Sequence, residues 1–354
     1  MNIGTDRGQG SRTPCSPPDI AIIGAGIAGL ACARTLVNGG YPVAVFDKGR
    51  RPGGRVGTRR VEGFAFDHGA QYFTADTAEF RTAIATARQS GAIAPWGGKI
   101  VALSDGAVPT VDDDRRRWVG VPGMSALAQH LSAGLDIRCD HRVADVVREG
   151  EAWRLIAGDG STFAEADLVV VAVPAPQAVP LLASSRELAD RAAAVTVAPC
   201  WAVMLGFDEP LSLPFDGAFI DGGPLAWIAR DRSKPERAGG EAWVLHAAPS
   251  WSRDHLEADR GAVSRDLQAA FQATVGLKRL RPNFAAAHRW RYARAEGSLG
   301  KTCLYDPNLR IGACGDWCLG SKIEAAYASG RAMADRIVAD INSAEPVENL
   351  GQKE

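Results

Sequence analysis

The stretch Asp-Ile-Ala-Ile-Ile-Gly-Ala-Gly-Ile-Ala-Gly-Leu, residues 19–30, joins a short apolar run to three glycines and then to a helical pattern. Each glycine has its own physical task in such a turn. Gly24 permits the tight change from strand to helix, Gly26 lets the backbone approach a pyrophosphate, and Gly29 lets the helix pack closely on the strand. The free N–H groups of the first helical turn then point at phosphates. The stretch therefore predicts a bound nucleotide.

The segments that follow support this prediction. Residues 27–37 form an Ala- and Leu-rich helical pattern, and residues 42–46 form a second strand that ends just before Asp47. An acid at that strand end is placed to accept hydrogen bonds from ribose hydroxyls. A G-x-G-x-x-G pattern alone is a weak signal, but strand, helix and acid together predict the opening β-α-β unit of a doubly wound sheet.

Length and charge limit the possible classes of protein. The 354 residues predict one large domain or two closely joined ones. A net charge of −1, with arginines interspersed among acids, argues against nucleic acid and membrane partners. No apolar run reaches the about 20 residues of a membrane helix. Residues 1–18 are polar and lack the apolar core of a signal peptide, so we expect a disordered leader and a cytoplasmic protein.

Three later segments also suit a ligand. Residues 49–56 form a basic, glycine-rich loop in which Arg55 offers a fixed fork of donors to phosphate. Residues 64–73 tighten at Gly69 and Ala70, where small side chains leave room for a flat ring system. Near the other end, a strand at residues 309–314 leads into Gly315 and Asp316, where backbone can meet a ligand and a carboxylate can bind a polyol chain. A helix follows over residues 323–341.

The pattern between these segments predicts the domain organisation. The apolar run 168–173 reads as a strand buried on both faces, residues 78–89 as a helix, residues 105–118 as strands with a charged turn, and residues 137–147 as strand. We expect a discontinuous nucleotide-binding domain from residues 19–75, 119–176 and 299–342, a substrate domain from residues 76–118 and 177–298, and a tail over residues 343–354. The substrate domain holds an aromatic supply suited to lining a pocket: Trp201, Trp227, His246, Trp251, Trp290 and Tyr292.

The seven cysteines lack the spacing of a metal site, and none is predicted. Reduced thiols in the cytosol are the simplest interpretation. Cys314 and Cys318 are close enough in sequence for a redox pair or a covalent flavin link, or are small apolar packing residues beside a glycine turn.

Three motifs in this order, Gly24 to Gly29 with Asp47, then Gly53-Gly54-Arg55, then Gly315-Asp316, resemble the flavin-dependent amine-oxidase superfamily. Further motifs are similar to its renalase branch, particularly the bacterial members: Arg51-Pro-Gly-Gly-Arg55, Asp67-His-Gly-Ala-Gln-Tyr72, Val121-Pro-Gly-Met124, Trp243-Val-Leu-His246, His288-Arg-Trp-Arg-Tyr-Ala293 and Cys314-Gly-Asp-Trp-Cys318. The resemblance implies an α/β fold, with a Rossmann-type FAD-binding domain and a second domain of mixed β-sheet plus helices.

The resemblance also implies a non-covalent FAD and the residues that contact it. The glycine turn with Ile27 and Ala28, and the loop with Gly53, Gly54 and Arg55, would hold the pyrophosphate. Asp47 stands where glutamate is more usual and would hold the ribose, beside Lys48, while Val143 would contact adenine. Residues Gly69, Ala70, Gln71 and Tyr72 would lie beside the isoalloxazine, and Gly315 and Asp316 by the ribityl or phosphate region. The helix start at Lys322, Ile323 and Glu324 would point at flavin N1.

Renalase-like enzymes are expected to oxidise the 2- or 6-dihydro isomers of NAD(P) to NAD(P)+, with hydride transfer to flavin N5 and O2 as the electron acceptor, which gives H2O2. The substrate pocket is expected to contain Tyr72, Trp227 and Trp290, which can stack on the nicotinamide. His246 or Arg230 can engage substrate polar groups, although His246 is equally compatible with a core position.

Two alternatives stay open. A flavin-containing amine oxidase would use an aromatic cage and, in the superfamily, a lysine that contacts flavin N5 through water, but no lysine here lies in a matching motif. A flavin-binding redox sensor without turnover is the other alternative, and only a turnover measurement separates it from an enzyme.

Overall fold

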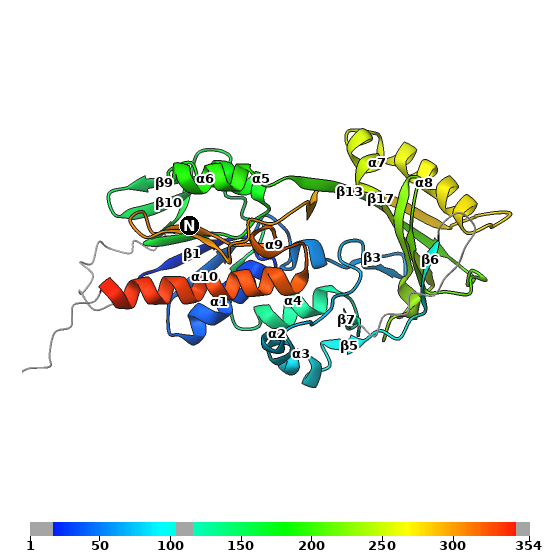
Figure 1. Ribbon diagram of the computed structural model, residues 1–354, viewed down its shortest axis with the longest axis horizontal. Coiled ribbons are helices and arrows are strands. Elements are labelled where there is room, and N and C mark those ends of the chain that lie inside the picture. Colours follow the sequence, from blue (N-terminus) through cyan, green and yellow to red (C-terminus); the bar gives the residue numbers. More distant parts are fainter. Residues whose placement is uncertain (1–16, 104–115, 345–354) are drawn as a thin grey trace, which may run out of the picture.

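The computed structural model describes residues 17–103 and 116–344 (Figure 1). Nearly all of the expected leader, most of the expected 105–118 strands and most of the expected tail lie outside these residues. Within the described part of the chain, no helix is long and apolar enough to cross a membrane.

A six-stranded sheet forms the first part of the fold, in the order β18-β19-β12-β1-β2-β8. Its strands are parallel except β18, which pairs antiparallel at one edge. The chain moves outward from β1 in both directions, as the sequence predicts for a doubly wound sheet. The strands are β1 (Ile20–Ile23), β2 (Val43–Phe46), β8 (Asp136–Arg138), β12 (Leu168–Val171), β18 (Leu304–Asp306) and β19 (Ile311–Ala313).

Both faces of this sheet are covered, which explains its almost continuous apolar strands. One core cluster joins the sheet to α1 (Ile27–Asn38), α4 (Ser125–Ser132) and α10 (Ile323–Ala344). The helices α1 and α10 lie side by side in Figure 1, and a Cβ at Gly330 would come 2.0 Å from the carbonyl oxygen of Ala28. The other face packs on α5 (Ala175–Leu181), α6 (Arg186–Ala193) and an antiparallel sheet of β9 (Asp145–Glu149), β10 (Ala152–Ile156) and β11 (Thr162–Ala166).

A second six-stranded sheet has the order β17-β13-β16-β15-β14-β6 and is antiparallel except for the β14–β6 pair. Figure 1 shows it at the opposite end of the molecule from β9 and β10, with α7 and α8 outside it. Trp201, Trp243 and Phe271 are buried between the sheet and these helices. The elements are β6 (Ile100–Leu103), β13 (Val197–Phe207), β14 (Gly217–Ile220), β15 (Leu225–Arg230), β16 (Glu241–Ala247), β17 (Phe284–Ala295), α7 (Pro249–Asp254) and α8 (Arg260–Thr274).

Shorter elements join the two parts. Phe64 and Phe66 pack on the second sheet, whereas Phe80 and Ile84 pack into the core of the first. Both contacts cross the domain division expected from the sequence, whose boundaries stay a prediction. The elements are β3 (Arg59–Val61), β4 (Phe64–Phe66), α2 (Ala78–Ala83), α3 (Ala85–Gln89), β5 (Ile93–Pro95), β7 (Trp118–Gly120), α9 (Asp316–Leu319) and two 3-10 turns, Gly54–Val56 and Asp231–Ser233.

Two elements differ from the expected pattern. The helix expected over residues 78–89 is interrupted at Ile84, which ends α2 and precedes α3. The single strand expected over residues 137–147 is wrong, because β8 and β9 belong to different sheets. The chain turns between them at Asp140, whose φ is +58°.

Candidate active site

A cavity of about 570 Å³ lies where the carboxyl ends of β1, β12 and β19 meet the inner face of the second sheet. The position between β1 and β12 is the switch point of the doubly wound sheet, where such folds bind ligands. The wall includes most of the site residues expected from the sequence: Gly26, Ile27, Ala28, Gly53, Arg55, Gly69, Ala70, Gln71, Tyr72, Trp227, His246, Trp290, Gly315, Asp316 and Ile323.

The three glycines of the turn differ in their surroundings. Gly24 has φ +109°, and a Cβ there would lie 2.6 Å from the carbonyl oxygen of Ala172. A Cβ at Gly29 would lie 1.9 Å from the carbonyl oxygen of Gly24, so the helix can approach the strand only without a side chain. A Cβ at Gly26 would have no atom within 4 Å. Gly26 faces open cavity space at the start of α1, whose N-cap has no side-chain hydrogen bond.

Asp47 braces the same turn from the end of β2. Its carboxylate accepts a hydrogen bond from the amide of Ala25 at 2.6 Å and another from the amide of Gly49 at 2.6 Å. The carboxylate therefore fixes the glycine turn and the start of the basic loop.

Arg55 and Asp316 connect the first and last parts of the chain at the cavity wall. The guanidinium donates two hydrogen bonds to the carboxylate, at 2.6 and 3.0 Å, and a third to the carbonyl oxygen of Ala293 at 3.0 Å. The side chain of Asp316 is 8% exposed and that of Arg55 is 32% exposed. Arg55 thus keeps donor groups for a ligand while its orientation is fixed by a bidentate pair.

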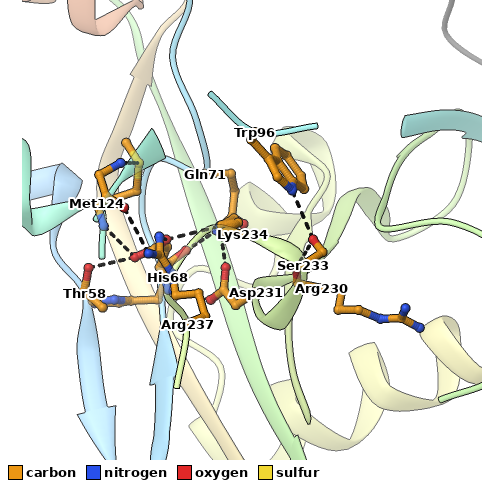
Figure 2. A network of polar contacts seen from close by, with 12 residues as sticks. Thr58, His68, Gln71, Trp96, Met124, Arg230, Asp231, Ser233, Lys234 and Arg237 are labelled. Carbon is orange, nitrogen blue, oxygen red and sulfur yellow. Dashed lines mark hydrogen bonds and ion pairs between the residues drawn. The ribbon is translucent and has the colours of Figure 1, made fainter. Parts of the chain in front are cut away.

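The loop from Gly69 to Tyr72 rests on a buried ionic network (Figure 2). Lys234 is fully buried and donates to Asp67 at 3.2 Å, to the side-chain oxygen of Gln71 at 3.2 Å, and to Asp231. Arg237 donates to Asp67 at 2.5 Å. Because Gln71 also lines the cavity, the network fixes one wall of the site.

The remaining contacts of Asp67 complete the network. Its carboxylate accepts hydrogen bonds from the hydroxyl of Thr58 at 2.7 Å and the amide of Met124 at 2.9 Å. Burial opposes its ionisation, but Lys234 and Arg237 outweigh burial and hold the pKa of Asp67 below its ordinary value. Burial raises the pKa of Asp231, and Lys234 offsets that effect only in part.

Aromatic side chains form the substrate-domain wall. Tyr72 lies 5.7 Å from Trp227, and Trp227 lies 4.7 Å from Phe219, measured between ring centroids. Irregular register in β15 between Leu225 and Trp227 brings two successive residues, Ala226 and Trp227, to the cavity. A similar irregularity in β13 brings residues 198–200 to it.

Three histidines and Trp290 lie together beside this wall. The ring of His68 stacks on Trp290 at 5.1 Å and meets His288 edge-on at 4.8 Å. The indole of Trp290 donates to the carbonyl oxygen of His68 at 2.8 Å, and Nε2 of His246 lies 3.3 Å from the same oxygen. Burial lowers the pKa of each of the three histidines to about 4, so all three are neutral at pH 7.

Several expected site residues lie outside the cavity wall: Gly24, Gly29, Asp47, Lys48, Gly54, Val143 and Glu324. Glu324 turns its side chain to α2, where it accepts hydrogen bonds from the amides of Asp76 and Thr77 at 2.9 and 2.8 Å. This carboxylate caps a neighbouring helix, so its main chain alone is left as a candidate flavin contact.

The expected substrate role of Arg230 is wrong. Its side chain lies on the outer face of β15, 5.1 Å over the ring of Trp243, and pairs with Glu241 at 3.0 Å. Trp201 of β13 also faces α7, since its indole donates to the carbonyl oxygen of His255, and Trp251 lies in α7 itself, where it stacks on the His255 ring. Alternation along the strands places the side chains of Arg230 and Trp201 away from the cavity.

Wall residues that were not predicted from the sequence include Cys200, Phe219 and Arg294. Lys322, at the helix start that was expected near the flavin, also lines the wall. No sequence motif marks Phe219 or Arg294, because their placement depends on how β14 and β17 pair within the second sheet.

Cys314 and Cys318 are both buried, and burial raises the pKa of the Cys318 thiol to about 12. A hydrogen bond to Cys32, together with burial, raises the pKa of Cys314 well above its ordinary value. Buried, protonated thiols fit the packing interpretation better than a reactive pair.

The parallel sheet with a glycine turn at its switch point, and the second sheet across the cavity from it, define a two-domain dinucleotide-binding protein of the flavoprotein type. Residues 22–86 match an NAD(P)-binding Rossmann-like domain, and residues 110–338, more than half of the chain, match the flavin containing amine oxidoreductases. The chain belongs to the flavin-containing amine oxidoreductase family, which implies FAD as its cofactor.

Known proteins support this assignment. A protein from Mycobacterium tuberculosis, assigned as the flavin-containing monoamine oxidase AofH, is 32% identical over 176 residues, which are 43% of this chain and 36% of that protein. Putrescine oxidase of Kocuria rosea is 43% identical over 61 residues, or 17% of this chain and 10% of that protein. A lysine-specific histone demethylase 1 homolog of Arabidopsis thaliana is 49% identical over 47 residues, or 13% of this chain and 6% of that protein. The matched segments thus span about a third or less of these relatives' lengths.

Two solved structures share the fold over 92% of this chain and 99% of their own. A crystal structure assigned as a protoporphyrinogen oxidase from Exiguobacterium has a TM-score of 0.74 at 16% identity. A redesigned putrescine oxidase double mutant has a TM-score of 0.65 at 15% identity. These likenesses establish the α/β fold with a Rossmann-like domain and a second sheet.

Proposed function

We propose that this protein oxidises the 2- or 6-dihydro isomers of NAD(P) to NAD(P)+, with FAD as hydride acceptor and O2 as the final electron acceptor. The balanced reaction consumes the dihydronucleotide, O2 and one proton and gives NAD(P)+ and H2O2. A cytoplasmic location stays part of this proposal.

The charge of the cavity wall carries the proposal. Its described residues include one carboxylate, Asp316, which is already paired with Arg55. The other charged side chains of the wall, Arg294 and Lys322, are cations. An amine substrate is itself a cation and would find no free carboxylate there, whereas the phosphates of a dinucleotide would be attracted.

The cavity residues fit FAD. Open space at Gly26, the start of α1 without a side-chain cap and the fixed fork of Arg55 suit a pyrophosphate. Asp47 would reach the ribose from the end of β2, and Gly315 with Asp316 would meet the ribityl chain. When bound, FAD supplies a two-electron acceptor that O2 can reoxidise.

The chain's own contribution is to orient the substrate and to exclude water. Tyr72, Trp227 and Trp290 offer flat surfaces to the nicotinamide ring. The indole N–H of Trp227 is buried without an acceptor among the described residues, and a carboxamide oxygen is an acceptor of the right kind. His246 is neutral and therefore does not oppose the positive charge that develops on the nicotinamide ring.

Amine oxidation is the second candidate, favoured by the names of the relatives and of the putrescine oxidase structure. The lysines of the described chain give it little support. Lys234, beneath the loop from Gly69 to Tyr72, is fully buried and engaged with two carboxylates, and Lys322 pairs with Asp76 at 3.0 Å.

Aerobic turnover tests the proposal. Purified holoenzyme supplied with 6-dihydroNAD, 2-dihydroNAD, ordinary 4-dihydroNAD or a panel of primary amines should consume one of the first two and release NAD+ and H2O2 in equal amounts. Aldehyde and ammonia from an amine, with both isomers unchanged, would establish the amine oxidase instead. No turnover of any of these compounds would favour the flavin-binding sensor.

A further inference from the structure

Phe219 is an exposed aromatic side chain at the solvent end of the cavity. It is 40% exposed, and the other large apolar side chain that is exposed in the described chain, Val147, lies on β9 in the other domain. Phe219 also belongs to the cavity wall, which Val147 does not. An exposed phenylalanine at the mouth of a ligand cavity is a candidate binding surface.

The neighbours of Phe219 leave its ring accessible. Phe219 pairs with Trp227 across β14 and β15, so the two side chains share one face of the sheet, with rings tilted by 59°. On its other side, Phe219 pairs with Ala102 of β6, and the next residue on the same face of β14 is Gly217. These two small neighbours add little cover beside the ring.

Three aromatic side chains follow one another from the inside of the cavity to its mouth. Tyr72 belongs to the loop held by Lys234, the buried Trp227 follows, and Phe219 comes last. A dinucleotide has two flat rings, one at each end. If its nicotinamide reaches the inner end, the adenine is left nearer the mouth.

We propose that Phe219 is the stacking surface for the adenine ring of the dinucleotide substrate. This inference rests on the proposed function and adds a second subsite to it. Stacking of a base on an aromatic side chain contributes roughly 1–3 kcal/mol as measured by alanine substitution, and the middle of that range corresponds to about 30-fold in affinity. The enzyme would then prefer dinucleotides to mononucleotides that carry the same nicotinamide.

Calorimetry on the holoenzyme tests this without turnover. NAD+ and nicotinamide mononucleotide would be titrated into wild type, Phe219→Ala and Phe219→Trp, with Val147→Ala as a control for loss of an exposed apolar side chain. We expect Phe219→Ala to weaken the affinity for NAD+ by about 30-fold and to leave the affinity for the mononucleotide within about two-fold. Phe219→Trp should keep NAD+ affinity, and Val147→Ala should match wild type.

The inference would be overturned if Phe219→Ala weakened the affinity for both nucleotides equally, or left both affinities unchanged. If Phe219→Ala dissociates an oligomer in sedimentation and leaves NAD+ binding unchanged, Phe219 covers a contact between copies of the chain, and the inference is wrong. A second, anaerobic experiment mixes wild type and Phe219→Ala with the reduced dinucleotide and mononucleotide isomers. It distinguishes failure of the adenine subsite from failure of the proposed function. A wild-type flavin that neither isomer reduces overturns the proposed function itself. Reduction with the same preference for the dinucleotide in wild type and in Phe219→Ala overturns only the adenine subsite.

Discussion

Arg55 and Asp316 are 261 residues apart in the chain, yet Nη2 of Arg55 lies 2.6 Å from Oδ1 of Asp316 and Nη1 lies 3.0 Å from Oδ2. The pair joins the glycine-rich loop after β2 to the start of α9 and stands in the wall of the cavity. It therefore connects the two chain segments that we propose to hold opposite parts of one FAD.

Removal of this pair should weaken cofactor binding. Arg55→Ala leaves the nearly buried Asp316 carboxylate without its partner and removes donors from the proposed pyrophosphate site. Charged hydrogen bonds contribute roughly 1.5–3 kcal/mol, so we expect at least a ten-fold rise in the Kd for FAD, measured by titration of the apoprotein. Arg138→Ala is the matched control, because the exposed Arg138–Asp136 pair should contribute about 0–1 kcal/mol. Equal effects of the two variants would refute the placement of Arg55.

Substitutions at two glycines of the same turn should have different effects, one on folding and the other on FAD binding. Gly29→Ala forces a methyl group against the carbonyl oxygen of Gly24 and should lower the melting temperature of the apoprotein strongly. Gly26 has φ −75° and open space at its Cβ position, so Gly26→Ala should fold normally. Its methyl group would occupy space proposed for the pyrophosphate, and FAD retention on purification should be lost. A Gly26→Ala protein that stays yellow would contradict this assignment.

The buried network beneath Gln71 should be sensitive to loss of one charge. Lys234→Met removes the ammonium between Asp67 and Asp231, and an uncompensated buried charge costs about 3–5 kcal/mol. Urea unfolding should show this loss. Addition of Asp231→Asn should restore a good part of the stability, because one of the two carboxylates is then neutral. A double variant no more stable than Lys234→Met alone would show that charge is not the cause.

The histidine cluster makes folding stability depend on pH. Burial lowers the pKa of His68, His246 and His288 from the ordinary 6.5 to about 4, so between these values the unfolded chain binds more protons than the folded one. Stability should therefore be full above pH 6.5 and should fall as the pH drops toward 4. Urea midpoints measured in that range should decline less steeply for His288→Gln than for wild type. An unchanged slope would mean that His288 titrates normally in the folded protein.

The cofactor half of the site could be read from the sequence because its residues follow strand ends at short, fixed offsets. The turn at Gly24, the acid at Asp47 and the Gly315–Asp316 step come directly after parallel strands, and parallel strands end at one edge of a sheet. The ion pair between Arg55 and Asp316 was not predicted, since each residue was interpreted as a ligand contact.

The substrate half could not be read in the same way. Trp227 faces the cavity and Arg230 the opposite side because of the strand face that each occupies, and the irregular register near Leu225 decides which face that is. The contacts of Lys234 depend on a 3-10 turn that brings it under a loop 163 residues away, at Gln71. Neither feature leaves a periodic signal in the chain.

Anaerobic mixing of the holoenzyme with single substrates tests the central claim most directly. The flavin absorbance should bleach rapidly with 6-dihydroNAD or 2-dihydroNAD, and far more slowly with putrescine at the same concentration, because the described residues of the cavity wall include no free carboxylate to bind a diamine. Rapid bleaching by putrescine or another primary amine, and none by either dihydronicotinamide isomer, would contradict the account.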